Sequence, residues 1–202
     1  MNRTFTISEN YNSFLWLPAK TASSTLSWIF AHFDFHHYIE ENGKIKLFRD
    51  GLVHFGHETN FPPQNENMSF IVSIANPYDR VFSLFKMGNT ERKDNFTKDD
   101  FDMFVSNHVF NNKNISWNVS VLLSERKPNY VVRKEYLFED LLKIPFIKSS
   151  KLNHCGILED MCNKKINSSF EYELKQKFFD YSTKEKIYEF FKSDFEYFDY
   201  SK

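Results

Sequence analysis

The chain has 202 residues, a formal net charge of -1, 41% hydrophobic and 26% charged residues. This balance predicts one folded domain over residues 1–202, and it excludes a disordered tail or a membrane bundle. The near-zero charge does not predict nucleic-acid binding, and no apolar run reaches the ~18 residues of a membrane span. The first residues lack the apolar core of a signal peptide, so we expect a cytoplasmic protein with no stable membrane insertion.

The first clear pattern along the chain is a strand, a loop and a helix. Residues 14–17 (FLWL) form a short apolar run that is typical of a buried strand. Small polar residues at 19–25 follow Pro18. The spacing of an amphipathic helix then appears at Leu26, Ile29, Phe30 and Phe33.

The same order occurs a second time. Residues 70–75 (FIVSIA) predict another buried strand. Asn76 then stands at the N-cap of a predicted helix, with Pro77 at its first position and Asp79 in its first turn.

Later segments continue the alternation. We expect a helix near 101–109, a strand at 129–133 (NYVVR), a short helix near 137–142 and a long helix over 183–198. Strands that alternate with helices predict an α/β fold with a mainly parallel sheet and a helical C-terminal third.

The loop at residues 18–25 (PAKTASST) has the composition of an anion-binding loop. Backbone N–H groups at a helix N-terminus carry partial positive charge, and small side chains let an anion approach them. Lys20 adds a mobile cation. The alternative is an ordinary loop with a Ser/Thr cap. Because the loop has no glycine, it is not the G-x-x-x-x-G-K-S/T loop of ATPases and GTPases.

This loop resembles the 5'-phosphosulfate loop of sulfotransferases that use 3'-phosphoadenosine 5'-phosphosulfate (PAPS). The nearest form is the Pro-Lys-Thr-Ala-Ser loop of the heparan sulfate 2-O-sulfotransferase branch, with Ala19 as an extra residue here. The resemblance implies that Lys20 is catalytic, because it stabilises the leaving phosphate. It also implies that the cofactor contacts come from Lys20, Thr21, Ala22, Ser23, Ser24 and Thr25.

Residues 73–85 (SIANPYDRVFSLF) resemble the family's second nucleotide motif, Arg-(Asp/Asn)-Pro-x-x-Arg-x-x-Ser. The resemblance implies that Ser83 binds the 3'-phosphate of the nucleotide. Ala75 replaces the leading arginine of the family motif. Arg80 or Lys86 are the cations available to compensate, and pairing with a carboxylate is the structural alternative for Arg80.

A third segment also resembles the family. Arg133, Glu135, Leu137 and Asp140 match its Arg-x-Glu-x-Leu-x-x-Asp pattern.

Sulfuryl transfer to a hydroxyl needs a base near neutral pH, and histidine, with an ordinary pKa of about 6.5, suits this role. In the 2-O-sulfotransferase branch, a Gly-His pair between the two nucleotide loops supplies the base. Gly56 and His57 resemble this pair, so His57 is the first candidate, with His54 and Glu58 as alternatives. His54 and His57 have the x2 spacing of a pair of zinc ligands. No second Cys/His pair is arranged to complete a tetrahedral site, so no metal is expected.

The resemblance extends from about Phe14 to Tyr200. It implies a P-loop-like α/β fold with a central parallel β-sheet flanked by helices. PAPS would be the donor, and the product would be 3'-phosphoadenosine 5'-phosphate. The acceptor partner would be a glycan or a small hydroxyl compound.

Two other functions stay open. A P-loop-type small-molecule kinase would need Mg²⁺ ligands and a Walker loop. A nucleotide-binding homologue that has lost turnover is suggested by Ala75.

Overall fold

The computed structural model describes residues 3–41, 44–49, 67–88, 96–110, 118–123, 126–164 and 177–202. The chain forms two compact units, and each unit combines two stretches of sequence. The first unit contains Met1–Ile74 and Arg126–Asn167, and the second contains Ala75–Glu125 and Ser168–Lys202. One domain over residues 1–202 stays a prediction.

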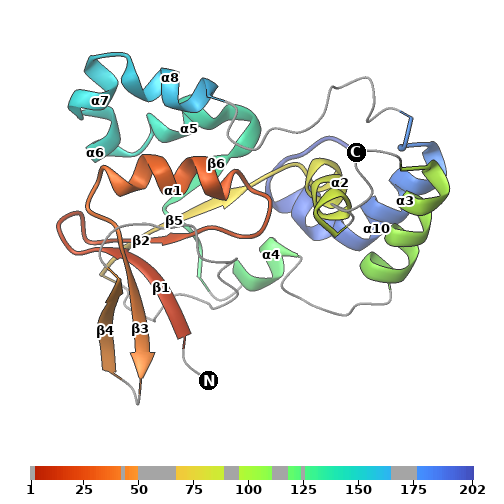
Figure 1. Cartoon of the computed structure of the whole chain (residues 1–202), viewed down its shortest axis with the longest axis horizontal. Coiled ribbons are helices and arrows are strands. Elements are labelled where there is room, and N and C mark those ends of the chain that lie inside the picture. Colours follow the sequence, from red (N-terminus) through yellow and green to blue (C-terminus); the bar gives the residue numbers. More distant parts are fainter. Residues whose placement is uncertain are drawn as a thin grey trace. The chain divides into compact units, whose positions relative to one another are not determined.

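The first unit is built on a six-stranded sheet with the order β4-β3-β1-β2-β5-β6 (Figure 1). Its strands are β1 (Arg3–Ser8), β2 (Ser13–Trp16), β3 (His36–Glu41), β4 (Lys44–Arg49), β5 (Ser69–Ile74) and β6 (Tyr130–Arg133). β2, β5 and β6 are parallel neighbours, whereas β1, β3 and β4 join the sheet through antiparallel pairs. The α/β class is confirmed, but the sheet is mixed where the sequence predicted a mainly parallel one.

β2 and β5 carry most of the core of this unit because their side chains are mainly apolar on both faces. Leu15 and Ile71 are fully buried on one face, and Trp16 and Val72 are buried on the other. The face that carries Leu15 is covered by α1 and by four short helices after β6 (Figure 1). These helices are α1 (Ser23–Ala31), α5 (Leu137–Leu141), α6 (Pro145–Lys148), α7 (Lys151–His154) and α8 (Ile157–Asn163).

The second unit is helical and has a core of aromatic rings. Its helices are α2 (Pro77–Gly88), α3 (Lys98–Phe104), a π-helix (Val105–Phe110), α4 (Val119–Leu122) and α10 (Tyr181–Tyr197). Phe101 lies at the centre of the cluster, with ring centroids 5.5 Å from Phe82 and 5.2 Å from Phe85. Such edge-to-face pairs stabilise a core beyond the area that they bury. Several of the chain's 24 phenylalanines therefore form the core of this unit.

The starts of α2, α3 and α10 follow capping signals in the sequence. Asn76 Oδ1 accepts a hydrogen bond of 2.9 Å from the Tyr78 N–H, as predicted for the start of α2. The helix predicted near 101–109 begins earlier, because Thr97 and Asp100 form a capping box before α3. The long C-terminal helix is confirmed as α10, where Asp180 accepts a hydrogen bond from the Thr183 N–H.

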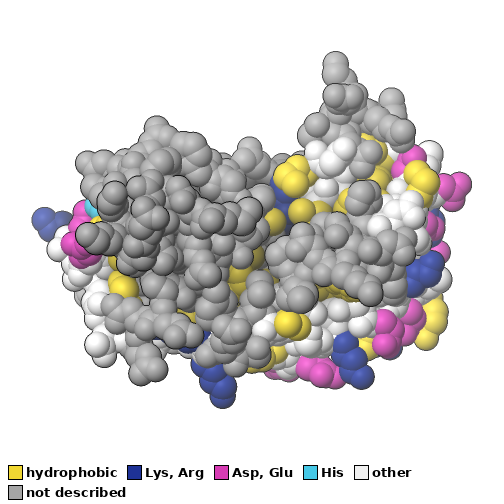
Figure 2. All heavy atoms as spheres, turned by 90° about the horizontal axis from the view of Figure 1, so that it is seen from below, with side chains coloured by type: hydrophobic (Ala, Val, Ile, Leu, Met, Phe, Trp, Pro, Cys, Tyr) yellow, Lys and Arg dark blue, Asp and Glu magenta, His cyan; other side chains and the backbone are white. Residues whose placement is uncertain are grey.

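The surface of the described residues is mixed in charge. On the face shown in Figure 2, basic and acidic side chains are interspersed over the part of the surface that is coloured by residue type. Among the described residues, no helix has the length and apolar content needed to cross a membrane.

Candidate functional site

The loop between β2 and α1 has a backbone conformation that is unusual for its residues. Lys20 has a φ of 65° and Ala22 a φ of 63°, so both are left-handed. Each such residue costs roughly 1–2 kcal/mol when it has a Cβ atom, and glycine is the usual choice there. The loop therefore makes glycine-like turns without glycine. Backbone strain of this kind is concentrated at functional sites in proteins.

Thr21 anchors the loop to the neighbouring strand. Its side chain is fully buried, and its Oγ1 donates a hydrogen bond of 2.7 Å to the Pro18 carbonyl. The same hydroxyl is hydrogen-bonded to Ser73 Oγ on β5. The Thr21 side chain thus holds the loop in place, so any contact of this residue with a ligand would come from its backbone.

The remaining small residues of the loop divide by exposure. Ser23 and Thr25 are buried, whereas Ala22 and Ser24 are partly exposed. All four lie at the start of α1, where N–H groups of the first turn carry partial positive charge. Their predicted contact with a nucleotide stays a prediction.

Lys20 is partly buried, and it makes no ion pair with any carboxylate of the described residues. Burial lowers the pKa of Lys20, and the nearby charge of Lys134 lowers it further. The sequence motifs assign no role to Lys134. The signal that was available is its place directly after the predicted strand at 129–133.

The two lysines lie at the same edge of the sheet. In the parallel register, Trp16 of β2 is level with Val72 of β5, and Ile74 of β5 is level with Arg133 of β6. The carboxyl ends of the three strands therefore meet at one edge, the usual place for ligands in sheets of this kind. Lys20 follows β2 and Lys134 follows β6 there.

The segment after β6 is held by a buried carboxylate. Asp140 accepts hydrogen bonds of 2.8 Å from Nε and Nη2 of Arg133 and one of 2.9 Å from the Arg133 N–H. Lys143 also donates to it. Although burial alone would raise the pKa of Asp140, the hydrogen bonds from Arg133 and Lys143 outweigh burial and lower it. Arg133 and Asp140, which match the third family motif, thus fix the turn that contains Lys134.

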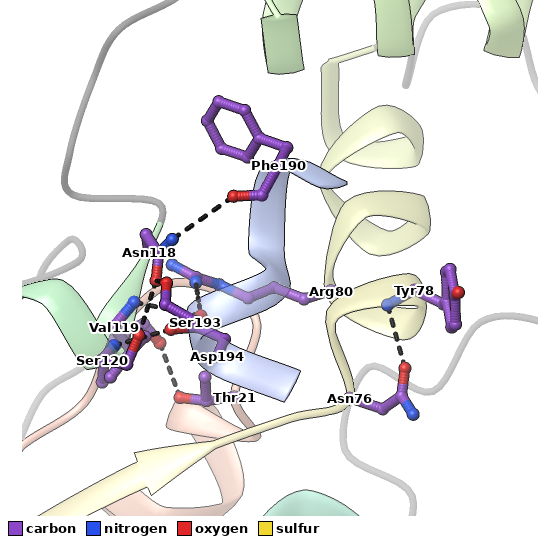
Figure 3. A network of polar contacts seen from close by, with 11 residues as sticks. Thr21, Asn76, Tyr78, Arg80, Asn118, Val119, Ser120, Phe190, Ser193 and Asp194 are labelled. Atoms are coloured by element: carbon purple, nitrogen blue, oxygen red, sulfur yellow. Dashed lines mark hydrogen bonds and ion pairs between the residues drawn. The ribbon is translucent and has the colours of Figure 1, made fainter. Parts of the chain in front are cut away.

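Arg80 is engaged within the second unit. Its side chain is 3% exposed, and its Nη1 lies 3.9 Å from Oδ2 of Asp194 (Figure 3). Burial lowers the pKa of Arg80 to about 10, so the guanidinium stays charged at neutral pH. This buried pair supports the structural interpretation of Arg80, and the predicted contact of Arg80 with a 3'-phosphate stays a prediction.

The rest of the second motif is described as well. Ala75 is 5% exposed, so an arginine at this position would have to enter a packed environment. Ser83 and Lys86 are partly exposed on α2. Their predicted contacts with the nucleotide stay predictions.

The candidate bases His57, His54 and Glu58 lie outside the described residues. The role of His57 therefore stays a prediction. Within the described ranges, no group of three or more His, Cys, Asp or Glu side chains is arranged to hold a metal ion.

A surface cleft of about 400 Å³ lies at the far end of α1 from the lysine edge. Its aromatic wall contains Tyr11 and Phe146, whose rings stack 4.2 Å apart. His32 and Phe33, which follow α1, also line the cleft. This cleft is separate from the β2–α1 loop, which precedes the helix.

Comparison of the chain with protein-family models, with curated proteins and with solved structures gave no match. The resemblance to sulfotransferases therefore depends on the sequence motifs.

Proposed function

We propose that the protein is a PAPS-dependent sulfotransferase with a P-loop-like arrangement of β2, β5 and β6. The observation that best supports this function is the β2–α1 loop. It presents Lys20, without an ion pair among the described residues, beside the start of α1 and at the carboxyl edge of the parallel strands. Cationic and amide donors at such an edge suit a phosphate or phosphosulfate group.

The chemistry of the loop fits an anionic nucleotide end. Charge on Lys20 is disfavoured by burial and by Lys134, and a bound anion would offset both effects. The left-handed Lys20 and Ala22 set the course of the backbone into α1 without a bulky side chain near the first turn. Ser24 is partly exposed at that turn and adds a hydroxyl donor.

Bound PAPS would supply an activated sulfuryl group. In the transfer, a bond forms between the acceptor oxygen and sulfur, and the bond from sulfur to the phosphate oxygen breaks. Lys20 offsets the charge that develops on the departing 5'-phosphate, and the backbone N–H groups at the start of α1 donate to it. His57 takes the proton of the acceptor hydroxyl, which belongs to a glycan or a small hydroxyl compound.

The first test is calorimetric titration with 3'-phosphoadenosine 5'-phosphate and, separately, with ATP and Mg²⁺. We expect micromolar binding of the bisphosphate and much weaker binding of Mg-ATP. A preference for Mg-ATP would instead establish the kinase alternative, and binding of neither nucleotide would contradict the sulfotransferase function.

The proposed base needs a test of its own. His57→Ala should lower turnover by about 10²–10⁴-fold, the usual contribution of general base catalysis, and leave bisphosphate affinity unchanged. His54→Ala and Glu58→Gln are the matched comparisons. If His57→Ala kept full turnover, the base role would pass to whichever comparison variant is inactive.

A further inference from the structure

Two cations lie at the carboxyl edge of the parallel strands in the first unit, and the sequence motifs assign a role to one of them. Lys20 lies in the loop after β2, and Lys134 is the first residue of the 3-10 turn after β6 (Lys134–Tyr136). β5 lies between these two strands, and all three run in the same direction. The two lysines therefore approach one edge from either side of β5.

Neither lysine is neutralised by a carboxylate of the described residues. The charge of Lys134 lowers the pKa of Lys20, and it adds to the effect of burial on the partly buried Lys20. This arrangement costs free energy in the unliganded protein. A ligand group with two negative charges would remove that cost.

The position of Lys134 is fixed by its neighbours. Arg133 is held by Asp140 through its side chain and its backbone N–H, and its guanidinium lies 4.6 Å from the centre of the Tyr136 ring. Asp140 in turn belongs to α5, which packs on the sheet. The backbone at Lys134 is thus held in place by its neighbours, whereas the Lys134 side chain is exposed and can reach a ligand.

We propose that Lys134 is a second binding cation for the 5'-phosphosulfate end of the nucleotide, where it acts together with Lys20. This inference rests on the proposed sulfotransferase function. It also gives Lys134 a role in specificity, because a lysine pair favours a dianionic 5'-group over an uncharged 5'-hydroxyl.

The experiment compares two ligands that differ only in the 5'-group. 3'-Phosphoadenosine 5'-phosphate has a 5'-phosphate, and adenosine 3'-monophosphate has a 5'-hydroxyl. Lys134→Gln should weaken binding of the first ligand by about 3- to 30-fold, the range for one exposed charge-assisted contact, and leave binding of the second unchanged. Lys134→Arg, which keeps the charge, should retain most of the affinity.

Lys148→Gln is the matched control. Lys148 is also an exposed lysine of the first unit, at the end of α6, and its loss changes the net charge by the same amount. The Lys148→Gln variant should bind both ligands with the affinity of the unmodified protein. Thermal unfolding of both variants checks that the fold is intact.

The outcomes separate the two proposals. If the unmodified protein binds the bisphosphate and Lys134→Gln binds it equally well, Lys134 has no part in the site while the sulfotransferase function stands. Equal weakening for both ligands would also overturn the assignment to the 5'-group. If the unmodified protein binds neither ligand, the proposed function itself fails, and the role of Lys134 fails with it.

Discussion

Arg80 of α2 and Asp194 of α10 form a buried ion pair in the second unit, with Nη1 and Oδ2 3.9 Å apart. Asp194 also accepts hydrogen bonds of 3.1 Å and 2.6 Å from the N–H groups of Val119 and Ser120 at the start of α4 (Figure 3). Burial raises the pKa of Asp194, and the hydrogen bonds from Ser120 oppose that rise. One carboxylate thus connects three helices.

Removal of this carboxylate should destabilise the protein. Asp194→Ala leaves the Arg80 guanidinium and two backbone N–H groups without their acceptor, so we expect a loss of about 3–5 kcal/mol in the free energy of unfolding. Urea denaturation followed by circular dichroism measures this loss. Glu196→Ala is the control, since Glu196 is exposed on the same helix and should change stability by less than about 0.5 kcal/mol. A cost of similar size for both variants would contradict the role of Asp194.

Lys20 should show a trade-off between stability and function. The folded protein lowers the pKa of Lys20, so the charged form of Lys20 destabilises the fold. This destabilisation is complete in the neutral range, and it decreases as the pH rises through the lowered pKa. Lys20→Met should therefore raise the free energy of unfolding at pH 7, by no more than about 0.5–1 kcal/mol because solvent screens a partly exposed charge. The same variant should lose at least about tenfold in bisphosphate affinity. Lys148→Met is the control for both measurements, and a less stable Lys20→Met would contradict the penalty.

The left-handed Ala22 makes the loop sensitive to the residue at that position. Ala22→Val places a β-branched side chain at a φ of 63° and should cost about 1–3 kcal/mol of stability. Ala22→Gly relieves the strain but removes a methyl group that packs on the core, so its effect should stay within about 1 kcal/mol. Chemical denaturation of the two variants distinguishes them. Equal stability of the two would show that the left-handed conformation is not maintained in solution.

Asp140 should make stability depend on pH. Its folded pKa is lowered, so its contribution is complete above the ordinary carboxyl pKa and is lost as the pH falls through the lowered value. Asp140→Asn should cost about 2–4 kcal/mol at pH 7, because Arg133 and Lys143 lose their acceptor charge. The difference from the unmodified protein should shrink below a pH of about 4. Chemical denaturation at a series of pH values measures the difference in free energy of unfolding between the two proteins. A difference that does not vary with pH would contradict the role of the Asp140 charge.

The sequence predicted the central elements well because they bury strongly apolar residues. The runs at 14–17 and 70–75 correspond to β2 and β5, and Asn76 caps α2 as its position indicated. The strands β1, β3 and β4 were missed, and the segment of β1, RTFTIS, is mostly polar. The segments of β3 and β4, HHYIEE and KIKLFR, contain many charged or polar residues, so they lack the apolar run by which buried strands are recognised.

The candidate site was predicted in part. The pattern at 18–25 predicted a loop that enters a helix, and α1 does begin at Ser23. Anion binding by this loop stays a prediction. The buried position of Thr21 and the pairing of Arg80 with Asp194 could not be predicted. Both depend on contacts between residues far apart in the sequence.

The sequence by itself determined the α/β class, the two strand–loop–helix segments and the presence of a lysine in the first loop, because periodicity and capping are local properties. Tertiary structure decided that the sheet is mixed, that Arg80 is used internally and that Lys134 and Lys20 follow strands that end at the same edge of the sheet. Strand order and register set which distant charges meet, and the burial of each charge then decides whether it needs a partner within the fold or is left for a ligand.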